Sequence, residues 1–329
     1  MGKKRKTNKN LPERVYFKHG SYYFVTYQNK WIRLDSKFAV ALAKYAKLLQ
    51  EPKKVTTMKD LIERYLFEVA PKKAQPTYRD YIRRSKSLIE VFADMNPLEV
   101  ETTHVSRYLD MKGNVSANRD IALLSSVFKK AIRWGYVKVN PCRGVERNEE
   151  MERDRYITDN EFIQRKKVMP EWITLVMDIA YLTSLRKTDI LKIKLKEDLT
   201  DAILKVTQSK TGKKQAFLLV DDDGKLNDLG MVIQKAKRTN KLIKSFYLFC
   251  NRYGKPYTTG GFDSIWQRHA KKDDVQDFQF RDLRSKAITD AEAQGINPKK
   301  LSGHKTDAMV NRYIKRYKVE KIKPLKKVL

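Results

Sequence analysis

The sequence predicts a multidomain protein with a small N-terminal β-sheet plus helix domain, then an all-α domain, then a mixed α+β domain rich in helices. Its 329 residues exceed the roughly 100 to 200 that one domain usually holds. The hydrophobic period changes from strand-like to helical near Thr56, and the charged stretch 146–155 is poor in apolar residues. We therefore predict domains at 1–52, 53–145 and 156–329, with 146–155 as an interdomain linker.

The first domain begins with the basic arm MGKKRKTNKN and continues into a segment rich in aromatic residues. Residues 15–34 predict three short strands, with turns at 19–21 and 28–30. Ser36 is a candidate N-cap for a helix that ends before Pro52. We expect a small basic sheet with one helix.

Apolar residues then recur at helical spacing as far as Trp134, and Gly135 ends the pattern. The four predicted helices begin at Thr56 or Thr57 and then span 77–92, 103–111 and 116–134. This spacing predicts a compact four-helix domain.

The last domain begins with Thr158 and Glu161, three residues apart as in a capping box. A helix over 172–182 follows, and residues 202–207 and 215–220 predict a hairpin whose turn contains Lys210-Thr211-Gly212-Lys213. The remainder is expected to be mostly helical.

Charge narrows the possible partners. The chain carries 70 Lys and Arg against 39 Asp and Glu, a net charge of +31, which excludes an ordinary neutral metabolic enzyme. Nucleic acid is the preferred polyanion, because each phosphate neutralised releases counterions. A membrane surface is a weaker alternative, since the charges run through the whole chain. The candidate DNA contacts are Lys3, Lys4, Arg5, Lys6, Arg14, Arg119 and Arg143.

The sequence lacks the motifs that are typical of several classes of enzyme. The sequence has no phosphate-binding glycine loop, no HExxH and no metal-ligand spacing among its four histidines, so we expect neither metal nor cofactor. The acidic run 221–224 is interpreted as a solvated turn rather than a two-metal nuclease site. Cys142 and Cys250 are expected to be inert packing residues. With no apolar membrane span or signal segment, a soluble cytoplasmic protein is expected.

Cationic residues followed by a tyrosine give the last domain its most informative pattern. Arg186 follows a predicted helix, with Asp189 three residues on, and Arg281 and Arg284 repeat that spacing. Leu301-Ser302-Gly303-His304 comes next, and Tyr313 lies nine residues after His304. The hairpin lysine Lys210 falls between the two arginine motifs.

These motifs, in this order, resemble the tyrosine recombinase (phage integrase) family over the whole last domain. Upstream, residues 116–119 with Asn140-Pro141 are similar to the end of that family's core-binding domain. Residues 11–16 and 20–23 resemble the arm-binding sheet of lambda-type integrases. The resemblance implies an arm-type DNA-binding domain, a helical core-binding domain and a catalytic domain.

The resemblance also implies a site-specific DNA recombinase, an integrase of a phage or mobile element, that cleaves and rejoins DNA through a 3′-phosphotyrosyl intermediate. Metal-free cleavage needs a nucleophile, cations around the phosphate and an acid for the leaving oxygen. By resemblance, Tyr313 is the nucleophile, Arg186 and Arg284 clamp the phosphate, Lys210 is the acid, His304 hydrogen-bonds the phosphate and Asp189 orients Arg186.

Some assignments stay open. Tyr317 is the fallback nucleophile, and Lys213 and Lys214 are rivals of Lys210. Arg281 stands where the commonest family pattern has histidine, and arginine is a poor base because its pKa exceeds about 12. Either Arg281 contributes positive charge while another group or water takes the tyrosine proton, or the enzyme is slow.

The implied partners are double-stranded DNA at core and arm attachment sites, a homotetramer on DNA, a DNA-bending host factor and a directionality factor, with no membrane. A bacterial host cytoplasm is the implied location. The segment 319–329 is a candidate contact with a neighbouring protomer. The rival interpretations are a noncatalytic DNA-binding regulator and a type IB topoisomerase-like strand transferase.

Overall fold

A computed structural model describes residues 11–314 apart from 13, 27–29, 51–54 and 240–244. The chain divides into two compact units, Met1–Met151 and Glu152–Leu329, which are described separately here. The boundaries predicted at 52, 145 and 155 stay predictions. No helix in the described ranges is long and apolar enough to cross a membrane.

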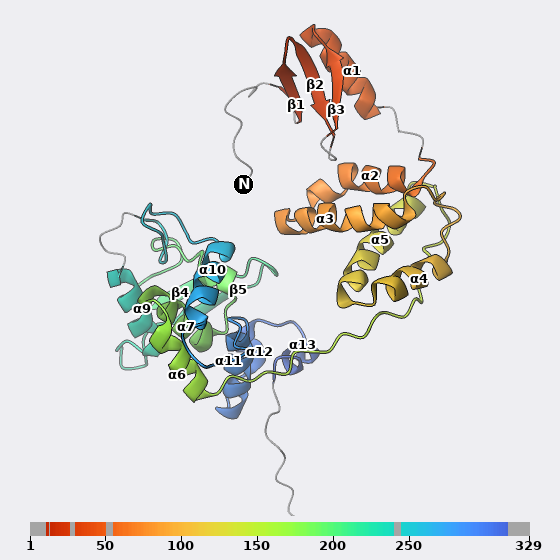
Figure 1. Ribbon diagram of the computed structural model, residues 1–329. Helices are drawn as coiled ribbons and strands as arrows, with labels where there is room; N and C mark the ends of the chain where they lie inside the picture. Colours follow the sequence, from red (N-terminus) through yellow and green to blue (C-terminus); the bar gives the residue numbers. More distant parts are fainter. Residues whose placement is uncertain (1–10, 13, 27–29, 51–54, 240–244, 315–329) are drawn as a thin grey trace, which may run out of the picture. The chain divides into compact units, whose positions relative to one another are not determined.

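The first described element is an antiparallel sheet in the order β1 (Val15–Lys18), β2 (Ser21–Val25) and β3 (Trp31–Asp35). Helix α1 (Phe38–Gln50) packs along one face of this sheet (Figure 1). His19 and Gly20 both have positive φ, which suits the tight turn between β1 and β2. The predicted sheet with one helix is confirmed.

A helical part completes the first unit. Thr57 caps the first helix in a capping box with Asp60, and the last helix buries Ile121, Leu124 and Phe128 at helical spacing. The elements are α2 (Met58–Glu68), η1 (Ala70–Lys72), α3 (Gln75–Phe92), α4 (Thr102–Lys112) and α5 (Val115–Arg133). The four predicted helices are confirmed.

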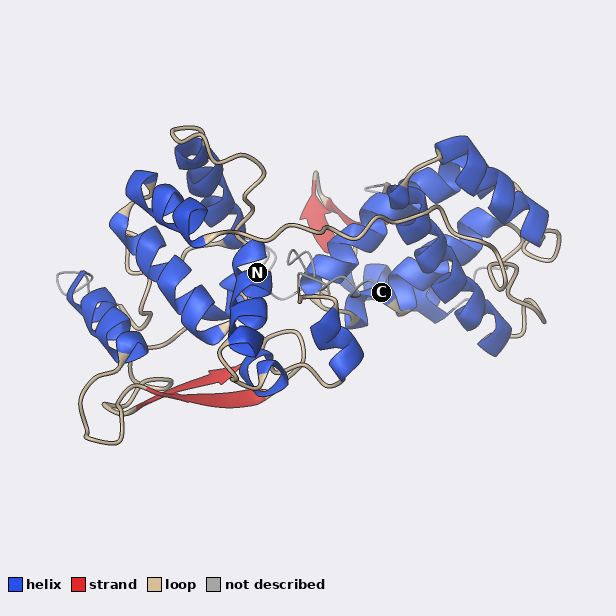
Figure 2. Ribbon diagram, turned by 90° about the horizontal axis from the view of Figure 1, so that it is seen from below, coloured by secondary structure: helices blue, strands red, loops and turns tan. Residues whose placement is uncertain are grey.

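The second unit is helix-rich with one hairpin. Figure 2 shows the hairpin, formed by β4 and β5, at the edge of the helices. The elements are α6 (Asp159–Val168), α7 (Glu171–Thr183), α8 (Lys187–Ile190), β4 (Ile203–Thr207), β5 (Lys214–Leu218), α9 (Asp228–Thr239), α10 (Thr259–Ala270), α11 (Asp282–Ala293), α12 (Pro298–Ser302) and α13 (Asp307–Asn311). Helix α7 packs against both α9 and α11, so it forms the centre of this unit.

A buried ionic network anchors α11, the helix that carries Arg284. The Lys286 side chain is 1% exposed, and its ammonium lies 2.6 Å from Asp159 and 2.9 Å from Asp290. The Asp290 carboxylate also accepts hydrogen bonds from the hydroxyls of Tyr156 at 2.7 Å and Tyr181 at 3.0 Å. Because its donors and acceptors are paired, the network fixes α11 against α7 and the start of α6.

We expect Lys286→Met to lower the free energy of unfolding by about 3 kcal/mol, because it leaves the Asp290 carboxylate buried without its cation. Lys299→Met is the matched control, since Lys299 pairs with the exposed Asp307 and its loss should cost less than about 0.5 kcal/mol. Denaturant unfolding of the full chain checks both. Equal effects of the two changes would contradict the anchoring role.

Candidate active site

The centre of the site is the guanidinium of Arg284, which is 6% exposed. It donates to the carbonyl oxygen of Ser184, to that of Ser302 at 2.8 Å, and to His304 Nε2 at 3.1 Å. These three acceptors come from the end of α7, the end of α12 and the loop that follows α12. One buried arginine of α11 therefore ties the end of α7, 100 residues earlier in the chain, to the motif that contains Ser302 and His304.

Arg186 reaches the same place through a turn after α7. Ser184 has φ 51° and ends α7 in the left-handed conformation, so that Arg186 becomes the N-cap residue of α8. Its Nη1 donates to Gln208 Oε1 at 2.7 Å. Burial, together with electrostatic repulsion from this second guanidinium, lowers the pKa of Arg284. The fold thus holds the two guanidinium groups close enough to repel one another.

An aromatic cluster positions the chain just before Arg281. The Phe280 ring lies 4.9 Å from that of Phe262 and 5.4 Å from that of Trp266. This packing fixes the backbone from which Arg281, itself exposed, projects at the start of α11. A cavity of about 510 Å³ is lined by Arg186, Arg281, Arg284 and Tyr313 among others.

Tyr313 lies in a turn just after α13, and its ring stacks on that of His304 with centroids 4.8 Å apart. The guanidinium carbon of Arg284 is 5.5 Å from the Tyr313 ring centroid. Val310 is 3% exposed, and its burial anchors α13 beneath this turn. The alternative nucleophile Tyr317 lies outside the described residues.

The partners of His304 decide its tautomer. Arg284 can only donate, so Nε2 of the ring must accept, and the proton is therefore on Nδ1. Nδ1 then donates to Ser302 Oγ at 2.8 Å. Burial and the nearby charges of Arg284, Arg186 and Lys213 lower the pKa of His304 to about 4. The ring is neutral at physiological pH.

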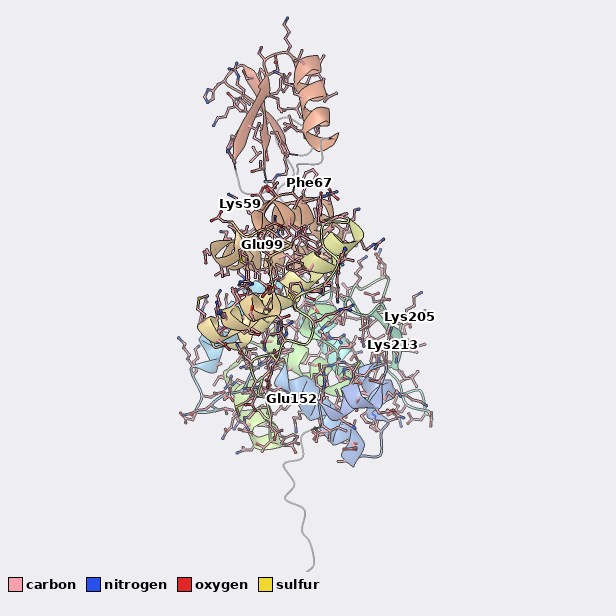
Figure 3. All side chains as sticks on the ribbon, turned by 90° about the vertical axis from the view of Figure 1, so that its right-hand side faces the viewer. Lys59, Phe67, Glu99, Glu152, Lys205 and Lys213 are labelled. Carbon is pink, nitrogen blue, oxygen red and sulfur yellow. The ribbon has the colours of Figure 1, made fainter. Side chains whose placement is uncertain are left out.

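The hairpin carries the candidate acid at its tip. Lys210 is exposed in the turn between β4 and β5 and is not among the residues that line the cavity. Its rival Lys213 is close enough for its charge to lower the pKa of His304. Lys205 and Lys213, labelled in Figure 3, are both exposed on this hairpin.

Asp189 has a different partner from the one we expected. Its Oδ1 accepts from the backbone N–H of Ser209 at 2.9 Å, and its buried Oδ2 has no hydrogen-bond partner in the structure. The guanidinium of Arg186 bonds Gln208 instead. Asp189 therefore fixes the start of the hairpin turn rather than bonding to Arg186.

The structure adds a residue that sequence reasoning missed. Arg153 donates to both carboxylate oxygens of Asp282, at 2.9 and 2.8 Å, and to Asp277 at 2.8 Å. Asp282 is the residue directly after Arg281, so this bidentate pair fixes the segment that carries Arg281 and Arg284. Arg153 and Asp282 are separated by 129 residues, and no local pattern connects them.

The candidate DNA contacts have different local partners. Arg119 forms a bidentate pair with Glu150, at 2.5 and 2.6 Å, whereas Arg143 is exposed. The guanidinium of Arg14 donates to the carbonyl oxygens of Val25 and Thr26. Lys3, Lys4, Arg5 and Lys6 lie outside the described residues, as does the segment 319–329. Within the described ranges, no cluster of three or more acidic, His or Cys side chains could hold a metal ion.

Comparison with known proteins identifies the class. The model of the phage integrase family matches residues 155–320. The integrase of Enterobacteria phage 434 is 27% identical over 260 residues, which cover 73% of this chain and 70% of that protein. The integrase of Escherichia phage HK022 is 24% identical and covers 95% of this chain and 96% of its own.

Solved structures show the same fold. A lambda integrase dimer bound to a COC′ core site matches with a TM-score of 0.68 and 23% identity, over 97% of this chain and 99% of the other. A lambda integrase tetramer bound to a Holliday junction matches with a TM-score of 0.65 and 22% identity, over 91% of this chain and 97% of the other. Since the family model spans half of the sequence, the chain belongs to the phage integrase family. The predicted family, fold class and enzyme class, tyrosine recombinase, are confirmed.

The low pKa of His304 gives stability a pH dependence. Between pH 6.5 and about 4 the unfolded chain binds a proton that folded His304 does not, so this residue makes stability fall as pH decreases through that window. We expect the free energy of unfolding of His304→Gln to fall less steeply than that of the wild type between pH 7 and about 5. Denaturant unfolding at several pH values measures both slopes. Parallel slopes would contradict the neutral buried ring.

Proposed function

We propose that this recombinase cleaves and rejoins one DNA strand at a time, with Tyr313 as its nucleophile. One observation carries the proposal: Arg186, Arg284 and Tyr313 line one cavity, and His304 stacks on the tyrosine ring. A phosphodiester entering this cavity meets two guanidinium groups and a phenol. These groups supply the nucleophile and the cations that metal-independent phosphoryl transfer requires, and the proposed acid, Lys210, comes from the hairpin turn.

In the proposed step, the Tyr313 oxygen attacks the scissile phosphorus while the bond from phosphorus to the 5′ oxygen breaks. The strand is then joined to the enzyme through a 3′-phosphotyrosyl bond, and Lys210 gives a proton to the departing 5′ oxygen. Arg186 and Arg284 stabilise the charge that builds on the nonbridging oxygens. Attack by a 5′ hydroxyl from the partner strand reverses the chemistry and completes the exchange.

Arg281 and His304 have supporting roles in this proposal. Arg281 lines the cavity but cannot accept a proton at physiological pH, so it contributes positive charge that stabilises tyrosinate. Water or another group takes the tyrosine proton. His304 is neutral and has one N–H, on Nδ1, so a direct bond to phosphate requires its ring contacts to rearrange.

We further propose double-stranded DNA as the substrate, with residues 53–145 binding core sites, 156–329 acting as the catalytic domain and 146–155 as the linker. The relatives described above include a dimer on a core site and a tetramer on a Holliday junction, which supports a tetrameric assembly for this chain. We also propose that a DNA-bending host factor and a directionality factor take part in the reaction. The proposed location is the cytoplasm of a bacterial host.

Residues 1–52 are proposed to bind arm sites. On the face of the sheet opposite α1, the rings of Tyr16 and Tyr23 lie 5.5 and 5.9 Å from that of Trp31. Lys18 lies over the Trp31 ring at 5.6 Å, and Arg33 is the strand neighbour of Tyr23. An exposed aromatic and basic face of this kind suits a nucleic-acid surface better than a packed protein core.

Tyr313→Phe should abolish covalent adduct formation while DNA affinity stays within about twofold of wild type, because the phenol oxygen alone is removed. The test uses nicked duplexes with candidate attachment sites and a denaturing gel that scores protein-linked DNA. Tyr136→Phe is a control that removes a phenol oxygen in the other unit. An adduct formed by Tyr313→Phe would contradict the assignment. Tight binding without any wild-type adduct would favour a noncatalytic regulator.

Arg281→His should retain measurable cleavage in the same assay, because histidine can supply positive charge or accept the tyrosine proton. Arg281→Ala should be slower than Arg281→His, since it supplies neither. Complete loss of cleavage in Arg281→His would contradict a role shared between the two residue types.

A further inference from the structure

Gln208 directly follows β4 and is a buried residue, 1% exposed. Its Oε1 accepts from Arg186 Nη1 at 2.7 Å and from Thr211 Oγ1 at 3.0 Å. Its Nε2 donates to the carbonyl oxygen of Ser302 at 3.0 Å and to Gln215 Oε1. All four hydrogen bonds that a primary amide readily makes are therefore formed inside the protein.

The contacts of Gln208 join the segments that carry the proposed catalytic groups. Arg186 is one partner, and Thr211 follows Lys210 in the hairpin turn. The Ser302 carbonyl accepts from Gln208 and also from Arg284 at 2.8 Å. The Gln208 amide thus bonds Arg186 directly and shares the Ser302 carbonyl with Arg284.

The packing around this amide leaves it little freedom. A Cβ atom built on Gly303 would lie 2.5 Å from Gln208 Nε2, so only glycine permits this approach. Gly303 also has φ +71°, a conformation that other residues rarely adopt. The motif Leu301 to His304 is therefore fitted against the Gln208 side chain.

We propose that Gln208 is a positioning residue for cleavage, an inference that rests on the proposed function. By occupying Nη1 of Arg186, it leaves the Nε and Nη2 edge of that guanidinium for two oxygens of the scissile phosphate. An amide oxygen orients the arginine without cancelling its charge, whereas a carboxylate in this place would weaken the attraction for phosphate. Gln208 thus has the role that the sequence assigned to Asp189.

The test is a double-mutant cycle on single-turnover adduct formation, with Gln208→Leu, Arg186→Ala and the double variant. The probe is the nicked duplex on which the wild type forms its Tyr313 adduct. Gln208→Leu should slow cleavage by about tenfold or more with DNA affinity within about twofold, and the double variant should be no slower than Arg186→Ala. Asn227→Leu is the matched control, because Asn227 is another amide next to the hairpin, and its side chain bonds the Leu218 carbonyl and the Gly230 N–H rather than Gln208 or Arg186.

A general loss of hairpin structure would add to the effect of Arg186→Ala, and additive effects would overturn the proposal. So would wild-type cleavage by Gln208→Leu. A second measurement does not depend on activity: NMR of the arginine side chains should show restricted rotation of the Arg186 guanidinium in the wild type and faster rotation in Gln208→Leu. Failure of the wild type to form an adduct would count against the proposed function, while the NMR result would still decide whether Gln208 holds Arg186.

Discussion

The site depends on how the protein keeps Arg284 charged while almost completely removing it from water. Burial of a cation costs several kcal/mol unless other groups replace its hydration. Here the replacements are neutral: two backbone carbonyls and an imidazole nitrogen. A carboxylate would satisfy the guanidinium equally well but would also cancel the charge that the proposed chemistry needs. Neutral acceptors stabilise the position of Arg284 and leave its charge available to an anion.

Pairing Arg284 with neutral acceptors requires that the surrounding structure hold those acceptors in place. The end of α7 and residues 302–304 must both meet the Arg284 guanidinium of α11, so the surrounding elements are held in place by other contacts. Lys286 anchors α11 to α6 and α7, and Arg153 holds Asp282 just after Arg281. The carboxylates of Asp159, Asp290 and Asp282 are therefore paired with Lys286 and Arg153 rather than with Arg186 or Arg284. The two carboxylates that line the cavity, Asp263 and Asp282, are paired with Lys187 and Arg153, so the charges of Arg186 and Arg284 stay available to an incoming phosphate.

The sequence predicted what is local or ordered along the chain. Helical periods located the helices, and the order of Arg186, Arg284, His304 and Tyr313 picked out groups that the fold brings together. It did not predict partners set by tertiary packing: Asp189 bonds Ser209, and Arg153 bonds Asp282 from 129 residues away. Gln208 had a usable signal, because it continues past the end of β4 the inward alternation of Leu204 and Val206, and a buried amide there must find partners.

The positions of Arg284 and Lys210 reflect two requirements of strand exchange. In the proposed mechanism the phosphate is held in one place throughout, which suits the buried position of Arg284. The 5′ oxygen must leave and a different one must arrive, so the group that exchanges a proton with it belongs at the rim. Lys210 is exposed on a turn whose backbone is closed by Gly212 donating to the Gln208 carbonyl at 2.8 Å. Gln208 thus bonds both the base of this turn and Arg186, so one residue connects the proposed acid to the proposed phosphate clamp.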